Sequence, residues 1–345
     1  MTCPLLLIFQ FISKGVTPSL RPRMWRLSLG LSAVVTENET KTYQNLRKKC
    51  DKYDFLTDEL FLLDVMNVAD DHRFFPFGDA VKEIVLCFSR DRTNSLYDIH
   101  GSQKRKDKKR NINDNIDFDR NGNDVNSMSN NDKDGNEKIC DNNYNYNYNS
   151  NEIDCNYNLS DNKLHEFDND CEYSTSSSEG RGIQPFSGFS NYFAPLCYLY
   201  DERSTLYSTA NRMWDMLWCR LNVICSDRGT LLNICKTFEN LLTFLNPKLF
   251  LHLLSLNLQP LRVAFSWMQM AFVGFIEVDQ LLILWDRILG FSDLTLFSLL
   301  ATAIFMYRSE ALLSCACKEK AILILNEGSN LKVIPLLQMM LFCEN

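Results

Sequence analysis

One arginine in this sequence stands where it could be aimed at a bound partner. Arg73 follows a helical pattern that ends in Asp70 and Asp71, and aromatic residues around Pro76 come directly after it. Proline cannot continue a helix and biases the residue before it toward an extended backbone, so we expect Arg73 on a turn and Phe75 extended. An arginine so placed either reaches a partner or is a surface charge paired with Asp70. These residues alone leave both interpretations open.

No other stretch has the pattern of a familiar enzyme centre. The sequence contains no glycine-rich phosphate loop, no GxSxG and no HExxH motif. Its 13 cysteines lack CxxC pairs and its 4 histidines lack metal-ligand spacing, so we expect neither a disulfide framework nor a metal site. Cysteines in apolar helical patterns behave as small buried hydrophobes, which suits a reduced, cytoplasmic protein. We expect the activity to reside in a surface, with no cofactor of the chain's own.

The apolar runs have the lengths of core helices. Residues 263–276 and 294–307 are uncharged runs of 14 residues each, too short to span a membrane. The apolar segment 3–13 has no preceding basic residue and no small-residue cleavage site, so it is a poor signal peptide. Membrane association is therefore expected to come through a partner.

A low-complexity segment interrupts the chain. In residues 111–170, 19 of 60 are Asn and 11 are Asp, too polar a composition to offset the entropy of ordering, so we expect 92–182 to be a disordered insert. The insert holds 12 of the 36 basic and 18 of the 43 acidic residues. The rest, with 24 and 25, is nearly neutral and has no electrostatic reason to bind nucleic acid. The basic cluster 104–110 is interpreted as a solvated charge run, with a nuclear-localisation signal or an anion-binding patch as the alternative.

Helical periodicity accounts for the remaining sequence. Apolar residues recur at three-to-four spacing in five patterns, at 40–51, 57–67, 80–88, 206–224 and 231–245. Thr17 and Asn246 each precede a proline, as helix caps do, and Gly30 marks a stop. Period-two strand patterns are lacking. The sequence predicts an all-α protein whose single core is formed by an N-terminal part, an insert and a C-terminal part, at 1–91, 92–182 and 183–345.

Three spaced motifs resemble those of TBC domains, the Rab GTPase-activating modules. GVTPSLRPRMW at 15–25, with Leu29-Gly30 four residues later, resembles the opening motif. DDHR at 70–73 resembles the D-x-x-R end of the arginine-finger motif, and LWDRILG at 284–290 resembles the late L-W-D motif. Trp267 falls at the expected upstream tryptophan. Each motif is weak alone, but their order and spacing on an all-α background favour this family over nearly the whole chain outside the insert.

The resemblance implies a V-shaped multi-helix domain that binds a GTP-loaded Rab in its groove. In the family, an arginine enters the nucleotide site and a glutamine from a Y-x-Q motif positions the attacking water. By this resemblance, Arg73 is the arginine finger and Asp70 orients it by a charge-assisted hydrogen bond. The Y-x-Q positions fall on 185–187, so Ser187 stands where the glutamine finger would be and that finger is absent. Gln184, three residues ahead of this position, is the remaining alternative.

The other motif residues are interpreted as structural. Trp25 and Trp285 are expected in the core. Arg21 is expected to pair with Asp286 and so to join the first helix to the late one. Three further arginines are assigned to the surface, namely Arg23, Arg26 and Arg287.

Two functions follow from the resemblance. The chain is either a Rab GTPase-activating protein that supplies an arginine but no glutamine, or a catalytically weak Rab-binding effector or scaffold in vesicle trafficking. GTP and Mg²⁺ would belong to the partner GTPase, which would also recruit this cytoplasmic protein to endomembranes. A third hypothesis makes the insert an assembly tether. Family members that this chain resembles in detail carry further sequence before the TBC domain. We therefore expect this chain to be a short form or an incomplete gene model.

Overall fold

A computed structural model describes four stretches of the chain, residues 4–91, 183, 185–222 and 228–342. All regular elements in these stretches are helices, so the predicted all-α class is confirmed. The predicted insert at 92–182, with its basic cluster, and Gln184 lie outside the described residues. Among the described helices, none is long and apolar enough to cross a membrane.

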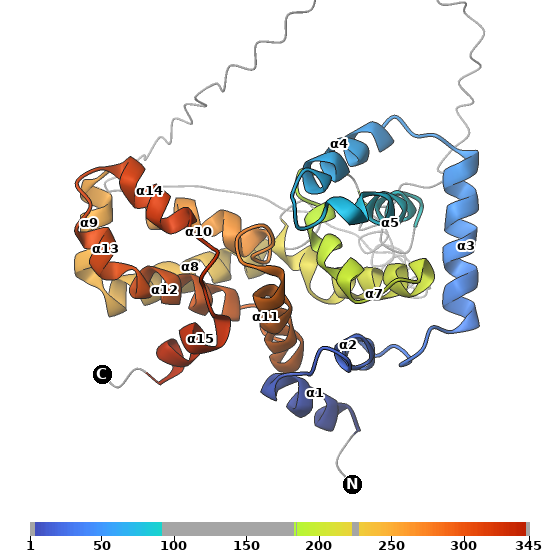
Figure 1. Cartoon of the computed structure of the whole chain (residues 1–345), viewed down its shortest axis with the longest axis horizontal. Coiled ribbons are helices and arrows are strands. Elements are labelled where there is room, and N and C mark those ends of the chain that lie inside the picture. Colours follow the sequence, from blue (N-terminus) through green and yellow to red (C-terminus); the bar gives the residue numbers. More distant parts are fainter. Residues whose placement is uncertain (1–3, 92–182, 184, 223–227, 343–345) are drawn as a thin grey trace, which may run out of the picture. The chain divides into compact units, whose positions relative to one another are not determined.

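The part before the insert forms α1 (Pro4–Lys14), α2 (Arg21–Ser28), α3 (Glu37–Lys52), α4 (Asp58–Ala69), the 3-10 helix η1 (Phe75–Phe77) and α5 (Gly78–Arg90) (Figure 1). A capping box begins α3, because Glu39 N donates to the Thr36 hydroxyl at 3.3 Å and Thr36 N donates to the Glu39 carboxylate at 2.8 Å. The helices predicted at 40–51, 57–67 and 80–88 are therefore present as α3, α4 and α5.

The part after the insert begins with two 3-10 helices, η3 (Ser190–Tyr192) and η4 (Ala194–Tyr198). It continues with α7 (Arg203–Met216), η5 (Trp218–Leu221), α8 (Arg228–Leu245), α9 (Pro247–Ser255), α10 (Pro260–Gln269), α11 (Val278–Phe291), α12 (Leu296–Tyr307), α13 (Ser309–Leu313), α14 (Lys318–Asn326) and α15 (Val333–Leu341). Helix α12 packs against both α8 and α15 (Figure 1). The predicted cap of α9 is confirmed, since Leu249 N donates to Asn246 Oδ1 at 2.9 Å.

Two predicted helices end earlier than their apolar patterns. The pattern at 206–224 breaks at Leu217 (φ −126°, ψ −63°), because the next residue, Trp218, turns into the core. The apolar run 263–276 leaves the helical conformation after Gln269, and two of its residues, at 271 and 272, have left-handed backbones. Both runs are apolar because they are buried, and burial alone does not distinguish a helix from a packed turn.

Two local predictions at proline residues were wrong. The first motif helix begins at Arg21 rather than after Thr17, and Pro22 occupies its first turn. Phe75 is not extended, because it begins the 3-10 helix η1, whose first positions accept Pro76 without losing a hydrogen bond. Pro22 and Pro76 each lie in the first turn of a helix, whereas Pro18, which was predicted to begin one, lies in the turn before α2.

Three tryptophans from distant parts of the sequence meet in the core. Trp25, Trp218 and Trp285 are fully buried, on α2, η5 and α11. The ring centroids of Trp25 and Trp285 are 6.1 Å apart, and those of Trp218 and Trp285 are 4.8 Å apart. Aromatic side chains bury the largest apolar areas, so this cluster ties α2 and η5 to α11. The prediction that Trp25 and Trp285 are core residues is confirmed.

Two of the arginines assigned to the surface are not there. Arg26 is 1% exposed, because its guanidinium donates to the Glu39 carboxylate at 2.8 Å and to hydroxyls of α7. Arg287 is partly buried and donates to the carbonyl oxygen of Ser13 at 2.5 Å, in the last turn of α1. Burial lowers the pKa of Arg287. Arg23 is exposed, as predicted.

Candidate functional site

Arg73 lies on the tight turn that connects α4 to η1. Phe74 N and Phe75 N both donate to the carbonyl oxygen of Asp71, at 2.8 and 3.0 Å, and the Tyr198 hydroxyl donates to the carbonyl oxygen of Arg73. Phe74 is buried and meets Tyr198 edge-on at 6.3 Å, whereas Phe75 is 66% exposed. The predicted turn is confirmed. The aromatic residues do not all anchor it, because Phe75 faces outward.

The carboxylate bonded to Arg73 is that of Asp71. Arg73 Nε donates to Asp71 Oδ1 at 2.9 Å and Arg73 Nη2 donates to Asp71 Oδ2 at 2.6 Å, which is a two-pronged ion pair. Arg73 N also donates to Asp71 Oδ1 at 2.9 Å, as in an Asx turn. These hydrogen bonds from Arg73 lower the pKa of Asp71, and the same pairing raises that of Arg73.

The assignment of Asp70 to this orienting role is therefore corrected. Asp70 is the C-terminal cap residue of α4, and its backbone N–H donates to the carbonyl oxygen of Met66 at 2.9 Å. Its side chain is exposed. The Asx turn requires the acid two residues before Arg73, because only that spacing lets one carboxylate reach both the backbone N–H and the guanidinium. The family motif specifies the acid three residues before Arg73, so a match to the motif selects Asp70 instead of Asp71.

Two backbone carbonyls from the connection between α10 and α11 also accept from Arg73. Arg73 Nη2 donates to Gly274 O at 2.8 Å, and Arg73 Nη1 donates to Ile276 O at 3.3 Å. The side chain of Arg73 is left 15% exposed. The guanidinium is thus held by its own turn on one edge and by a segment 200 residues later on the other.

The connection that carries these carbonyls has an unusual backbone. Ala271 (φ 49°) and Phe272 (φ 66°) adopt left-handed conformations, which cost non-glycine residues about 1–2 kcal/mol each. Phe272 N donates to Trp267 O at 2.7 Å, and Trp285 Nε1 donates to Ala271 O at 3.1 Å. Trp267 also stacks on Phe275, with ring centroids 4.1 Å apart. The motif residues Trp267 and Trp285 therefore shape the segment that meets Arg73.

Ser187 is exposed on a turn that α4 holds in place. The carboxylate of Asp64, buried on α4, accepts from Gly188 N at 2.5 Å and from Ser190 N at 2.7 Å. Gly188 has φ 88°, and a Cβ at this position would lie 2.2 Å from Met270 Cε. Glycine is favoured here by its left-handed backbone conformation, and a larger residue would also displace the end of the Met270 side chain. The Ser187 turn therefore packs against α4 and the end of α10.

The Arg73 turn and the Ser187 turn thus share the same two supports. Helix α4 leads into the Arg73 turn and binds the Ser187 turn through Asp64, while residues 269–276 contact both turns. Sequence reasoning missed Asp64, Asp71 and this connection. The signal for Asp64 was present, because it is an acidic residue on the face of α4 that buries Phe61, Val65 and Val68. No residue type marks the carbonyl oxygens of Gly274 and Ile276 in the sequence, because every residue has a backbone carbonyl group.

The predicted pair of Arg21 and Asp286 is present in the core. Arg21 Nε donates to Asp286 Oδ1 at 3.0 Å and Arg21 Nη2 donates to Asp286 Oδ2 at 2.9 Å. Trp25 Nε1 donates to the same carboxylate at 2.6 Å. The Asp286 side chain is 1% exposed. These bonds join α2 to α11, so the residues of the first and last motifs form one structural joint.

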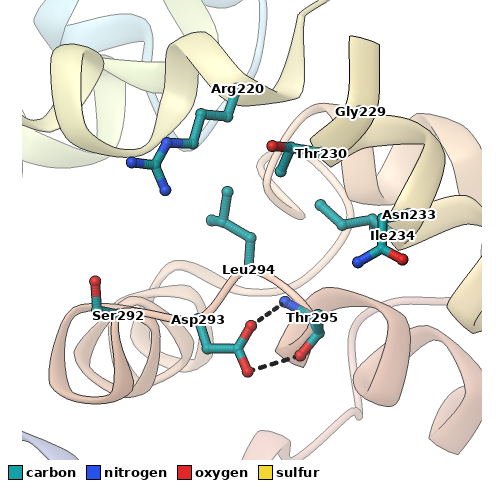
Figure 2. Close-up of a pocket in the computed structure, with 9 residues that line it drawn as sticks. All are labelled: Arg220, Gly229, Thr230, Asn233, Ile234, Ser292, Asp293, Leu294 and Thr295. Carbon is teal, nitrogen blue, oxygen red and sulfur yellow. Dashed lines mark hydrogen bonds between the residues drawn. The ribbon is translucent and has the colours of Figure 1, made fainter. Parts of the chain in front are cut away.

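A separate pocket of about 470 Å³ lies between the start of α8 and the connection from α11 to α12 (Figure 2). Figure 2 shows the Leu294 side chain between its walls and the carboxylate of Asp293 bonded to Thr295, whose N and Oγ1 each donate at 2.8 Å. These bonds lie in the turn that precedes α12. None of the predicted site residues lines this pocket. Within the described residues, no group of three His, Cys, Asp or Glu side chains is arranged to hold a metal ion.

Comparison with known proteins identifies the domain. Residues 186–313 match the family model of the Rab-GTPase-TBC domain. The human protein TBC1 domain family member 19 is 32% identical over 335 residues, which cover 96% of this chain and 53% of that protein. The chain contains a TBC domain. It spans about half the length of this relative.

Two solved structures have the same fold. The Ypt/Rab-GAP domain of Gyp1p superposes with a TM-score of 0.59 at 10% identity, covering 97% of this chain and 90% of that one. The Chlamydomonas flagellar RabGAP TBC domain superposes with a TM-score of 0.57 at 12% identity, covering 99% and 85%. Ser187, Trp267 and Asp286 lie inside the matched range of the TBC family model, whereas Arg73 precedes it.

Proposed function

We propose that this TBC domain is a GTPase-activating module for a Rab-family small GTPase, and that Arg73 is the residue it supplies. The observation that carries the proposal is the placement of Arg73 on a fixed turn, with its side chain partly exposed and oriented by a carboxylate two residues away. The hydrogen bond from the Tyr198 hydroxyl to Arg73 O and the buried Phe74 ring fix the backbone of this turn. The bound GTP and its Mg²⁺ belong to the partner.

The chemistry asks for an arginine at this position. During phosphoryl transfer, negative charge develops on the transferred group, and a guanidinium supplied in trans offsets it with two donors in a fixed fork. Arginine fingers contribute about 10³ to 10⁵ in rate to GTPases. A serine hydroxyl at position 187 is too short to reproduce an amide that both donates to and accepts from water. Positioning of the attacking water is therefore assigned to the GTPase's own glutamine.

A second function is favoured by the exposed Ser187 and by the contacts of Arg73. A domain without a glutamine finger, whose arginine is bonded to its own chain, can bind a Rab as an effector or scaffold without stimulating hydrolysis. Such a module would act in membrane trafficking from the cytoplasm, and the Rab would bring it to the membrane. The two functions share the partner and differ only in the rate of GTP hydrolysis.

Single-turnover GTP hydrolysis across a panel of Rab proteins tests the first function. The wild-type chain is expected to accelerate at least one Rab, and Arg73→Ala is expected to lose the acceleration by about 10³-fold or more. Arg23→Ala removes an equally charged but exposed arginine and serves as the matched control. If no Rab is accelerated, or if Arg73→Ala equals the wild type, the activator function fails. Capture of a GTP-loaded Rab by both proteins, without acceleration, would support the second function.

A further inference from the structure

The guanidinium of Arg73 has two hydrogen-bonding edges, and the structure binds each in a different way. The edge formed by Nε and Nη2 faces the Asp71 carboxylate, with bonds of 2.9 and 2.6 Å. The end edge formed by Nη1 and Nη2 faces two carbonyl oxygens, those of Ile276 at 3.3 Å and Gly274 at 2.8 Å. Arginine has five N–H groups, so four are committed and one on Nη1 is left.

The two edges differ in strength. The bonds to Asp71 are charge-assisted and form a fork, whereas the bonds to Gly274 and Ile276 are to neutral carbonyls, and the one to Ile276 is the longest of the set. An anionic acceptor that approaches Arg73 therefore displaces the carbonyls before it displaces the carboxylate. Displacing them frees a pair of donors that can bind two oxygens of one phosphoryl group.

The two edges also differ in what they are attached to. Asp71 belongs to the same turn as Arg73, and its Oδ1 also accepts from Arg73 N at 2.9 Å. This carboxylate moves with the arginine when the turn moves. Gly274 and Ile276 belong to the connection between α10 and α11, so their bonds break when the guanidinium shifts toward a partner.

We propose that Asp71 is the positioning residue for Arg73, and that it stays bonded to Nε and Nη2 while phosphoryl oxygens of a GTP-loaded partner replace the carbonyls of Gly274 and Ile276. This inference rests on the proposed function. It assigns the role to Asp71 and not to Asp70, the acid of the family motif. In the absence of the partner, the two carbonyl oxygens accept the hydrogen bonds of the Nη1 and Nη2 edge.

Kinetics with three single variants test the assignment. Asp71→Asn keeps an amide oxygen for the Asx turn but removes the charge and one acceptor of the fork. It is expected to lower kcat by about 10- to 100-fold, the worth of a charge-assisted hydrogen bond, with KM changed less than about twofold. Asp79→Asn, the same change at an exposed site in the first turn of α5, is the matched control. Asp70→Asn tests the alternative that the acid of the family motif positions Arg73. If Asp70→Asn carries the loss of kcat and Asp71→Asn does not, the proposal is overturned.

A readout without the GTPase separates this inference from the proposed function. In the full chain labelled with ¹⁵N-arginine, the Nε–H signal of Arg73 is assigned by its absence in Arg73→Lys. The signal is expected to exchange slowly with solvent in wild type, Asp70→Asn and Asp79→Asn, and at least about tenfold faster in Asp71→Asn, because the Nε–H then loses its charged acceptor. An unchanged exchange rate in Asp71→Asn contradicts the proposal. If no Rab is accelerated, the proposed function fails, and this measurement alone decides whether Asp71 orients Arg73.

Discussion

Two arginine–aspartate pairs among those in the described residues have the same chemistry and opposite placement. Arg21 and Asp286 are 265 residues apart in the sequence, and the Asp286 side chain is 1% exposed. Arg73 and Asp71 are two residues apart, with side chains 15% and 23% exposed. The first pair joins two helices, α2 and α11. The second pair holds one side chain on one turn.

The two pairs differ in whether an acceptor on a partner molecule can replace one of the hydrogen bonds of the arginine. Asp286 also accepts from Trp25 Nε1 and its side chain is 1% exposed, so breaking this pair leaves a buried charge without its partner. Arg73 has an edge held only by neutral carbonyls, and its pair is near solvent, where the loss of an ion pair costs little. A long-range buried pair is suited to stability, and a local, partly exposed one is suited to binding.

The largest expected effect tests whether the local pair serves catalysis. Arg73→Lys keeps the charge but loses the fork, so we expect most of the acceleration of the Rab to be lost, by about 10³-fold, while the free energy of unfolding changes by less than about 1 kcal/mol. Single-turnover hydrolysis and thermal unfolding measure the two quantities. A lysine variant that retains the full rate would show that Arg73 contributes only its charge.

The next prediction concerns the buried pair. Asp286→Ala leaves Trp25 Nε1 buried without an acceptor and Arg21 with only the long bond to Val16 O at 3.4 Å. We therefore expect the free energy of unfolding to fall by about 3–5 kcal/mol and the melting temperature by roughly 6–20 °C. Asp71→Ala, the same truncation in the partly exposed pair, is expected to cost about 1 kcal/mol or less. Thermal unfolding of the two variants measures this contrast directly. Equal losses would remove the distinction between the pairs.

A smaller effect is expected from restoring the residue that the site lacks. Ser187 is exposed, so Ser187→Gln adds an amide without disturbing the core. We expect about a tenfold increase in the rate of Rab-stimulated hydrolysis, the worth of one net hydrogen bond. Ser187→Met, which has a similar length and no amide, is the control and should leave the rate unchanged. A rate that does not rise with glutamine would argue that position 187 does not face the attacking water.

The smallest expected effect is the pH dependence of the local pair. Arg73 lowers the pKa of Asp71, so the pair stabilises the fold fully above the ordinary Asp pKa of about 3.9, and this contribution is lost as the pH falls through the lower folded-state pKa. His72 Nδ1 lies 3.5 Å from Asp71 Oδ1 and would add its own pH dependence, so the comparison carries His72→Gln in both proteins. In that background, the difference in melting temperature caused by Asp71→Asn should be constant from about pH 5 to pH 8 and shrink in more acidic solution. A difference that varies across the neutral range would contradict this assignment.

Much of the helical architecture could be predicted from the sequence, because periodicity and capping chemistry are local. The cap at Asn246 and the amphipathic face of α5 follow directly from residue types. The pair of Arg21 and Asp286 was predicted as well, although only the resemblance of the two motifs to a known family brought these distant residues together. What escaped were features that depend on tertiary packing, such as the break at Leu217 and the left-handed residues after α10.

The candidate site was less predictable than the fold. Arg73 could be singled out by its motif, but its partner could not, because Asp70 and Asp71 are the same residue type and only the turn decides between them. The carbonyls of Gly274 and Ile276 belong to backbone that any sequence carries. The burial of Arg26 was also missed, since its acceptors come from three separate segments.

Helix α4 has a consequence for how the length of this protein can vary. Asp58, at the start of α4, accepts from Arg90 Nη2 at 2.5 Å just before the predicted insert, and Asp64 accepts from Gly188 N at 2.5 Å just after it. These two acids are six residues apart, about 9 Å along the helix, so one rigid element secures both flanks of residues 92–182. Closing a loop between fixed ends costs only about 0.6 kcal/mol for each doubling of its length. Insertions and deletions between Arg90 and Gly188 should therefore be nearly neutral for folding, so the domain can be lengthened or shortened there without changing its core.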